Sequence, residues 1–209
     1  MQYPPAIIVY VIIIKIYLGT WLSLGYNREK HHRRSLRLRG YNYTNPGAYF
    51  VTVSTWNREF LFGDIVNGIM KVNEYGEIVQ DEWVRTEDVR PNITLDEFVI
   101  MPNHFHGILV INDEGRCSCR GTLQRAPTVE RFGKPVSNSI PTIVRLFKST
   151  TTKQINLIRN HSGMPLWQRN YYEHVMRNEK ELFKIRKYIK DNPLQWELDV
   201  ENPKNMINP

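Results

Sequence analysis

Cysteine is scarce in this sequence, which contains only Cys117 and Cys119 among its 209 residues. A single residue separates the two, and the stretch around them is polar and flanked by glycine. A structural zinc knuckle needs two intervening residues and a second pair of ligands, so this spacing excludes one. We expect both thiols to be reduced, in a cytoplasmic loop.

Internal repeats are absent, and neither charged nor apolar residues are in excess. Charged residues make up 23% of the chain and hydrophobic residues 41%, ordinary values for a globular domain that exclude disorder throughout. The length suffices for one good core and hardly for two. We therefore expect one domain over residues 41–200, with an apolar segment (1–25) and a basic arm (26–40) before it and a polar tail (201–209) after it.

One long apolar run occurs near the N-terminus, over residues 6–24, where Lys15 is the only charged residue. Its length could just span a bilayer, and the arginines that follow would hold the rest of the chain in the cytoplasm. No positive charge precedes the run and no small-residue cleavage site follows it, which is atypical of a signal peptide. Two interpretations stay open, a membrane anchor at the inner face of the membrane and an upstream extension of the coding frame. Both predict a cytoplasmic protein.

Positive charge exceeds negative charge, with a formal net charge of +7 and a pI of about 9.4. This balance favours an anionic partner, of which nucleic acid is the commonest. The basic arm at 26–40 is either a solvated, mobile segment or a segment that follows phosphates, with binding that weakens as salt is added. A basic soluble protein without such a partner is the alternative.

Strand and helix signals alternate along the first half of the domain. Residues 48–55 are rich in β-branched and aromatic residues, which predicts a strand. An Asn-Gly pair at 67–68 between apolar residues predicts a hairpin, and Asn73 is placed to cap the helix that follows. The Pro-Asn pair at 102–103 divides two apolar runs and predicts a second hairpin.

The second half continues with a helix that begins near Ser139, a strand within residues 165–177 and a last helix. Asn178 with Glu181 three residues later forms a capping box for the last helix. The order of the elements predicts an α+β fold of the ferredoxin-like kind, an antiparallel sheet with helices packed on one face.

His104 and His106 lie one residue apart in the second strand of the predicted 102–103 hairpin. Side chains alternate along a strand, so both imidazoles point to the same face. Apolar residues fill the other face, and a strand that is apolar on both faces is central and covered. Two neutral imidazoles on one face can chelate a divalent metal. Structural histidines with satisfied hydrogen bonds are the alternative.

Tyr188 and Asn192 stand four residues apart in the last helix and therefore on one face of it. They border the apolar stripe of that helix and should lie at the edge of what the helix covers. The alternative for Tyr188 is a boundary tyrosine with a solvated hydroxyl. For Asn192, followed by Pro193, it is a residue that ends the helix.

The segments "HFH" (104–106) and "YIKDN" (188–192) together carry a resemblance to a known family. The chain resembles the transposases associated with repetitive extragenic palindromes (REP), which are single-tyrosine HUH endonucleases. The segments of the resemblance are "HHRRSLRLRGYNYTNPGAYFVTVSTWNREFLFG", "EFVIMPNHFHGILVI", "IVRLFKSTTTKQIN" and "WQRNYYEHVMRNEKELFKIRKYIKDNP". The resemblance covers nearly everything after residue 25. "HFH" alone is unspecific, whereas the full set in order is specific.

The resemblance implies that His104 and His106 hold a divalent metal, Mg²⁺ or Mn²⁺, with Asn192 as the third ligand. It implies that Tyr188 attacks a phosphodiester of single-stranded DNA at palindromic, hairpin-forming sequences. The 5′ end then becomes attached to the tyrosine, a free 3′ hydroxyl is released, and the strand can be rejoined elsewhere. Relatives in the wider superfamily carry glutamine at the position of Asn192, whose side chain is one methylene shorter. A homodimer is left open.

Other residues compete for roles in such a site. Tyr171 and Tyr172 are alternative nucleophiles, but adjacent strand residues face opposite ways, so we expect one of them in the core. Glu173 and His174 we expect to be ordinary surface or sheet residues. For phosphate contacts the candidates are Arg33, Arg34, Arg37 and Lys148.

Two rival functions are compatible with the same sequence. One is a protein of the same fold that binds DNA hairpins without cleaving them. The other is a metal-dependent hydrolase that uses water, in which Tyr188 is structural. A hydrolase would be favoured by a carboxylate near the histidines, and the nearest ones in the sequence, Asp96, Glu97 and Asp113, lie outside the strand as we predict it.

Overall fold

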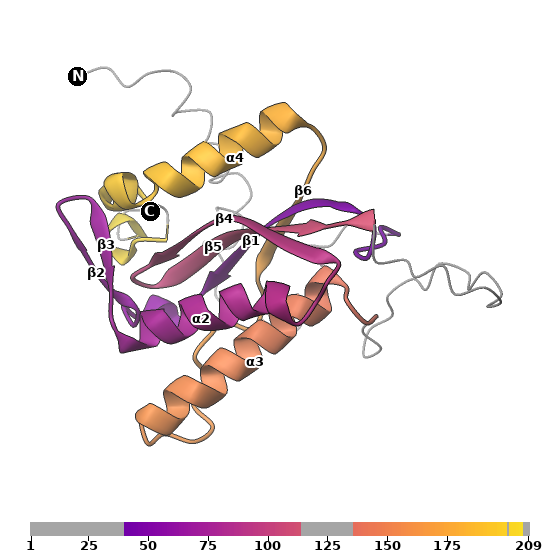
Figure 1. Cartoon of the computed structure of the whole chain (residues 1–209). Helices are drawn as coiled ribbons and strands as arrows, with labels where there is room; N and C mark the ends of the chain where they lie inside the picture. The colour runs from indigo at the N-terminus through magenta and orange to yellow at the C-terminus, as the bar shows by residue number, and fades with distance from the viewer. Residues whose placement is uncertain (1–39, 114–135, 200, 207–209) are drawn as a thin grey trace, which may run out of the picture.

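The structure, a computed structural model, describes residues 40–113, 136–199 and 201–206. Figure 1 shows a sheet between helices, with the C-terminal turns beside a small separate hairpin. In chain order the elements are β1 (Gly47–Ser54), η1 (Trp56–Arg58), β2 (Gly63–Val66), β3 (Ile69–Val72), α2 (Glu74–Asp88), β4 (Ile93–Met101), β5 (His104–Ile111), α3 (Ile140–Ile158), β6 (Tyr172–Met176), α4 (Glu179–Asp191), η3 (Pro193–Leu198) and η4 (Pro203–Met206).

The main sheet has four strands in the order β4-β5-β1-β6, and every neighbouring pair is antiparallel. Without the inserted β2–β3 hairpin, the chain runs strand, helix, strand, strand, helix, strand, as in ferredoxin-like folds. The predicted α+β class is therefore confirmed. The strand that carries the histidines, β5, is central, as the apolar residues on both of its faces predicted.

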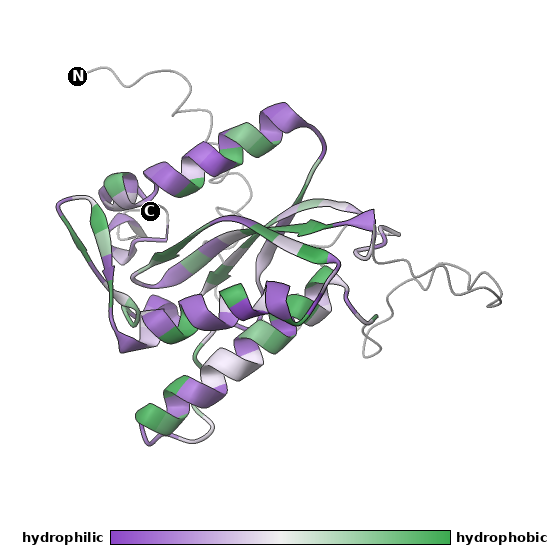
Figure 2. Cartoon of the chain, viewed as in Figure 1, coloured by the Kyte–Doolittle hydropathy of each residue, from purple (hydrophilic) through white to green (hydrophobic). Residues whose placement is uncertain are grey.

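The helices occupy both faces of the sheet, so the prediction that all of them pack on one face is wrong. α2 and α3 cover the face to which Phe105 and Leu109 of β5 point. α4 covers the opposite face, where Ile185 and Ile189 pack with Ile108. Figure 1 shows α4 on the side of the sheet away from α2 and α3, and Figure 2 shows apolar residues in the strands and on the helices that cover them. A helix on the histidine face is needed because β5 is apolar on that side too.

The predicted turns and caps are present. At the β2–β3 turn, Asn67 and Gly68 have φ values of 53° and 74°, the left-handed geometry that this pair tolerates. The Asn73 side chain accepts hydrogen bonds from two backbone N–H groups at the start of α2. Asn178 Oδ1 accepts from the Glu181 backbone N–H, and the Glu181 carboxylate accepts from the backbone N–H one residue before the cap. The Asn-Gly turn and both asparagine caps are therefore confirmed, whereas the Glu181 side chain bonds Arg177 and not the cap residue itself.

The strand predicted within residues 165–177 is shorter than expected, because only Tyr172–Met176 pairs as β6. Trp167 makes an isolated bridge to Thr55, and the Gln168 N–H donates to the Ser54 carbonyl at the end of β1. The carbonyls of residues 168–170 accept hydrogen bonds from Lys148 of α3. This segment is thus held by a side chain rather than by a strand ladder.

Gly107 lets α2 approach the sheet closely. A Cβ atom at this position would lie 2.5 Å from Trp83 Cζ2 and 2.7 Å from the Phe105 ring. Trp83 is fully buried, so the clash cannot be relieved by moving into solvent. We expect Gly107→Ala to lower the free energy of unfolding by roughly 1–3 kcal/mol in urea denaturation. Because Phe105 would still crowd the new methyl group, Trp83→Phe in the same background should recover part of this cost. If the costs of Gly107→Ala and Trp83→Phe in the double variant were strictly additive, the steric explanation would be contradicted.

Several predictions concern residues outside the described ranges. They are the apolar segment at 6–24, the basic arm at 26–40 except for its last residue, and both cysteines. Within the described ranges, none of the helices combines the length and the apolarity needed to cross a membrane.

Candidate metal and tyrosine site

The site begins on β5, where His104 and His106 point to the face that α4 covers. Both side chains are buried. β1 lies alongside in antiparallel register, which places Ser54 opposite His104 and Thr52 opposite His106. The ring centroids of His104 and His106 are 4.5 Å apart. The predicted pairing of the two imidazoles on one covered face is therefore observed.

The hydrogen bonds of His104 define which of its nitrogens is free. Its Nδ1 lies 2.9 Å from Asn103 Oδ1. The Asn103 amide nitrogen donates to the carbonyls of Glu201 and Arg58, so Oδ1 must be the amide atom that faces His104. An amide oxygen only accepts, so His104 Nδ1 carries the proton. The lone pair therefore lies on Nε2, which is buried and has no hydrogen-bond partner in the described part of the chain.

His106 lies between a hydroxyl of β1 and the tyrosine of α4. Its Nδ1 is 2.8 Å from Thr52 Oγ1, and its Nε2 is 3.2 Å from the Tyr188 hydroxyl. A metal-bound imidazole usually donates its other N–H to an acceptor such as this threonine. Tyr188 is half-buried as a residue, and its hydroxyl lies on the inner side, against His106.

The position of Tyr188 depends on α4, which ion pairs and hydrogen bonds fix to β4. Arg186 bonds both oxygens of Asp96, with Nε–Oδ1 and Nε–Oδ2 distances of 3.0 Å, and Lys190 pairs with Glu97 at 2.7 Å. Asp96 and Glu97 occupy a β-bulge of β4, where one extra residue turns consecutive side chains toward the helix. We conclude that these two carboxylates orient the helix and do not belong to the histidine cluster.

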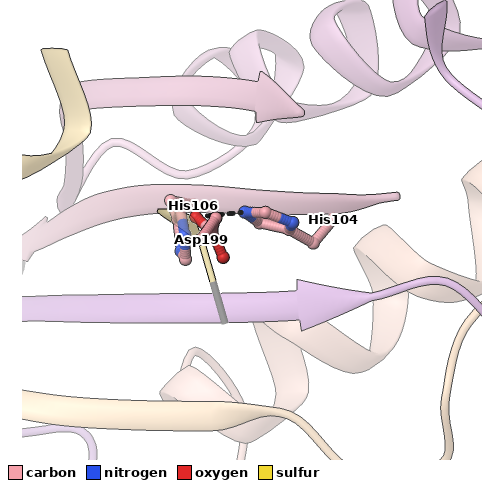
Figure 3. Close-up of side chains that lie close together, drawn as sticks. All are labelled: His104, His106 and Asp199. Atoms are coloured by element: carbon pink, nitrogen blue, oxygen red, sulfur yellow. Dashed lines mark ion pairs between the residues drawn. The ribbon is translucent and has the colours of Figure 1, made fainter. Parts of the chain in front are cut away.

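Asn192, at the end of α4, is linked to His104 by Asp199, a residue that was not predicted from the sequence to belong to the site. Its Nδ2 donates to Asp199 Oδ2 at 3.0 Å, and Asp199 Oδ2 lies 4.0 Å from His104 Nε2. Figure 3 shows His104, His106 and Asp199 converging. Ligand-type atoms of these three residues all lie within 4.8 Å of one another. The expectation that no carboxylate stands near the histidines is therefore wrong.

Asp199 was missed because it follows the last predicted helix and lies far from the histidines in sequence. Pro193 ends α4, and the turn η3 folds the chain back so that Asp199 returns beside Asn192. The backbone N–H of Glu201 donates to Asp199 Oδ1 and fixes the carboxylate. The one available signal was acidic residues shortly after the helix-ending proline, which alone does not predict a site.

A second carboxylate, that of Glu201, lies next to the cluster and is buried. It pairs with Arg58 at 2.8 Å and accepts a hydrogen bond from Ser54 Oγ at 3.0 Å. Burial raises the pKa of Glu201, and Arg58 and Ser54 oppose that shift. Residues from the predicted polar tail thus form one wall of the site.

The imidazoles are neutral and the phenol is protonated at physiological pH. Burial lowers the pKa of His104 to about 3, with a smaller contribution from Arg58. Burial and the neighbouring His104 hold the pKa of His106 well below its usual value. Burial and the carboxylates of Asp199 and Glu201 raise the pKa of Tyr188 well above its usual value. The 4.0 Å contact of His104 with Asp199 is consequently not a charged pair.

Stability should fall in acid because of the two histidines. Unfolded histidine has a pKa near 6.5, so below that pH the unfolded chain binds protons that the folded chain excludes. The stabilisation is complete above about pH 6.5 and is lost as the pH falls toward the folded pKa, which is about 3 for His104. We expect the free energy of unfolding without metal to fall by roughly 2 kcal/mol per histidine from pH 7 to pH 5. In urea denaturation, the free energy of unfolding of His104→Gln/His106→Gln should depend less on pH between pH 7 and pH 5. An unchanged pH dependence would contradict the assignment of neutral, buried imidazoles.

The donor atoms fit a divalent cation. His104 Nε2 and Asn192 Oδ1 are buried lone-pair atoms without hydrogen-bond partners in the described residues. Ligand atoms on one small divalent ion lie within roughly 4 Å of each other, close to the spacing observed here. Two nitrogens with carboxylate and amide oxygens suit a transition metal such as Mn²⁺ better than Mg²⁺.

The remaining candidate residues lie elsewhere. Arg33, Arg34 and Arg37 are outside the described residues. Lys148 lies on α3, across the sheet from the histidines. Tyr171 packs on the α2–α3 side and Tyr172 on the α4 side, as their strand positions predicted. On β6, His174 hydrogen bonds Glu181 of α4 at 2.7 Å.

Comparisons with known proteins identify one relative of high similarity. No protein-family model matches the chain. An uncharacterized protein of Haemophilus influenzae is 43% identical over 179 residues, which cover 85% of this chain and 97% of that protein. The chain belongs to the family of this Haemophilus protein.

Two solved structures show a lower similarity to this chain. One is a REP-associated tyrosine transposase bound to a REP hairpin, with 20% identity, a TM-score of 0.49, and coverage of 78% of this chain and 74% of that one. The other is a Deinococcus radiodurans protein thought to be a transposase, with 19% identity, a TM-score of 0.37, and coverage of 75% of this chain and 97% of that one.

Proposed function

We propose that the protein is a metal-dependent tyrosine transposase that cleaves and rejoins single-stranded DNA at hairpin-forming sequences. The observation that supports this most is the position of the Tyr188 hydroxyl, 3.2 Å from His106 Nε2 and beside a buried cluster of metal-ligand atoms. A structural tyrosine at a helix boundary has no need of such neighbours. The resemblance of the segments around these residues to REP-associated transposases leads to the same proposal.

His104, His106 and Asp199 would hold the metal, with Asn192 beside them as a fourth donor. When bound, the metal would supply positive charge that polarises the scissile phosphate. His106 Nε2 has one lone pair, so its use as a ligand would release the Tyr188 hydroxyl from the 3.2 Å hydrogen bond. The tyrosine would then be free to face a phosphate.

The reaction proposed for Tyr188 conserves a phosphodiester. The phenol oxygen attacks phosphorus, the bond to the 3′ oxygen breaks, and the 5′ phosphate stays on the tyrosine. The proton lost by the phenol is balanced by the proton gained by the released 3′ hydroxyl. Because burial and the nearby carboxylates raise the pKa of Tyr188, the phenol keeps its proton in the free enzyme. The stored bond allows a second 3′ hydroxyl to rejoin the strand without ATP.

The charges around the site support a requirement for metal in DNA binding here. Asp199 and Glu201 are both buried at the site, and Arg58 forms an ion pair with Glu201. Two carboxylates against one guanidinium repel a phosphate, whereas a bound divalent cation reverses the sign. We expect the site to be selective for phosphate only in the metal-bound form.

A hydrolase that uses water is the second candidate, and the presence of Asp199 favours it. A carboxylate beside two metal-binding imidazoles can act as a general base for a water molecule. In this alternative Tyr188 contributes only packing and a hydrogen bond. The two candidates differ in their products, because hydrolysis leaves no protein attached to DNA.

The experiment is incubation of the full chain with a DNA hairpin that carries a single-stranded flank and a label at its 3′ end, with Mn²⁺, Mg²⁺ or EDTA. A labelled band that stays with the protein in denaturing gels, and only with metal, supports the transposase. Cleavage without such a band supports the hydrolase. Binding without cleavage under any condition would overturn both and leave a hairpin-binding protein.

A further inference from the structure

A second feature with chemistry of its own lies on the opposite side of the sheet from the tyrosine. It is a groove of about 730 Å³ between one side of α3 and the segment 162–169 that leads toward β6. The α3 side chains that line it recur at helical spacing and include Arg145, Lys148, Thr152 and Lys153. Arg169 lies on the facing segment. We call this feature the α3 groove.

The α3 groove carries positive charge with no negative charge to balance it. No aspartate or glutamate lines it. Within the described ranges of the chain, none of its lysines or arginines forms an ion pair. Arg145, Lys153 and Arg169 are exposed. Surface cations in folded proteins are commonly interspersed with acids, so a concave strip of cations alone is a site for an anion.

Lys148 shapes this groove rather than contacting a ligand. Its ammonium donates to the carbonyls of residues 168, 169 and 170 at 2.5, 3.2 and 3.4 Å. Burial lowers the pKa of Lys148 to about 8. The bonds hold the backbone around Arg169 at a fixed distance from α3. The exposed Arg169 is thereby kept in the same groove as the exposed Arg145 and Lys153, with the half-buried Lys148 between the two walls.

The α3 groove and the tyrosine site meet at the end of β1. The Gln168 N–H, in the wall of the groove, donates to the Ser54 carbonyl at 2.9 Å. The Ser54 hydroxyl donates to Glu201 in the wall of the tyrosine site at 3.0 Å. One residue therefore contacts both features, which places them at the same end of β1.

We propose that the α3 groove binds the phosphate backbone of DNA, outside the region where the strand is cut. The inference rests on the proposed function for the choice of DNA as the polymer. It assigns phosphate contacts to Arg145, Lys153 and Arg169, and it gives Lys148 a positioning role. Arg and Lys contacts to phosphates position a nucleic acid without reading its sequence, so this surface should bind hairpins of any sequence.

The test is binding of a fluorescein-labelled DNA hairpin with a single-stranded flank, measured by anisotropy over a series of salt concentrations. All proteins carry Tyr188→Phe and the buffer contains EDTA, so that neither cleavage nor metal contributes. The groove variant is Arg145→Gln/Lys153→Gln/Arg169→Gln, because glutamine keeps helix propensity and removes charge. The matched control removes two arginines and one lysine from exposed positions elsewhere, Arg85→Gln/Lys71→Gln/Arg177→Gln.

We expect the groove variant to bind at least roughly tenfold more weakly near physiological salt, with a salt slope lower by about 2–3. The control should keep most of the affinity. Equal losses in the two variants would show that net charge alone is responsible and would overturn the proposal. An unchanged groove variant, or a parent that binds no hairpin, would overturn it too. Covalent product in the separate metal assay would then still support the proposed function, so the two failures are distinguishable.

Discussion

Replacing Tyr188 by phenylalanine is expected to abolish the covalent protein–DNA product and to lower strand cleavage by at least about 10³-fold. The phenol oxygen is the proposed nucleophile, and phenylalanine retains the ring that packs edge-on to Phe50. The variant loses the hydrogen bond to His106, whose net contribution is about 1 kcal/mol. Cleavage and adduct are measured on denaturing gels with Mn²⁺.

Tyr172→Phe is the matched control, because Tyr172 lies on the same side of the sheet and also packs against Phe50. This variant should retain the adduct. Manganese binding should be unchanged in Tyr188→Phe, which separates loss of the nucleophile from loss of the metal. Full cleavage by Tyr188→Phe would contradict the tyrosine mechanism and favour the water-using hydrolase.

Asp199→Ala is expected to weaken Mn²⁺ binding by at least roughly 100-fold. In the part of the chain that the structure describes, Asp199 is the carboxylate whose oxygen lies within 4.8 Å of the ligand nitrogens of both imidazoles. Removing it deletes the anionic ligand and leaves the Asn192 amide and the Glu201 backbone N–H without their acceptor. Isothermal titration with Mn²⁺ measures the effect, and thermal unfolding with and without metal measures the linked stability.

Glu201→Gln controls for the loss of a buried carboxylate near the same place. Glu201 binds Arg58 and Ser54 and is outside the group of three metal-ligand residues. Its replacement should change Mn²⁺ affinity far less than Asp199→Ala does. Equal losses in both variants would mean that the general negative charge, rather than a specific ligand, attracts the cation.

Much of the fold could be predicted because its signals are local. The Asn-Gly turn at 67–68, the caps at Asn73 and Asn178, and the turn at 102–103 each depend on neighbouring residues. The facing of His104 and His106 follows from strand alternation alone. Which face each helix covers could not be predicted, because β5 is apolar on both faces and would accept a helix on either.

The incomplete part of the predicted site has a different cause. Asp199 is near the histidines only because η3 reverses the chain after Pro193, and no periodicity marks a turn of that kind. Asp96 and Glu97 were expected outside the histidine strand, and a β-bulge of the neighbouring strand aims them at α4. Lys148 was a candidate for phosphate contact from its charge alone. Its three hydrogen bonds to backbone carbonyls depend on how the segment 168–170 packs beside α3, which no local pattern predicts.

The most direct test of the central claim is to determine which end of the cut strand stays on the protein, and on which residue. Hairpin DNA labelled at its 3′ end and at its 5′ end is reacted with Mn²⁺, the protein is digested, and labelled peptides are identified by mass spectrometry. The 3′ label should remain with the peptide that contains Tyr188, and the 5′-labelled fragment should be released with a free 3′ hydroxyl. Cleaved DNA with a free 5′ phosphate and no labelled peptide would contradict the account.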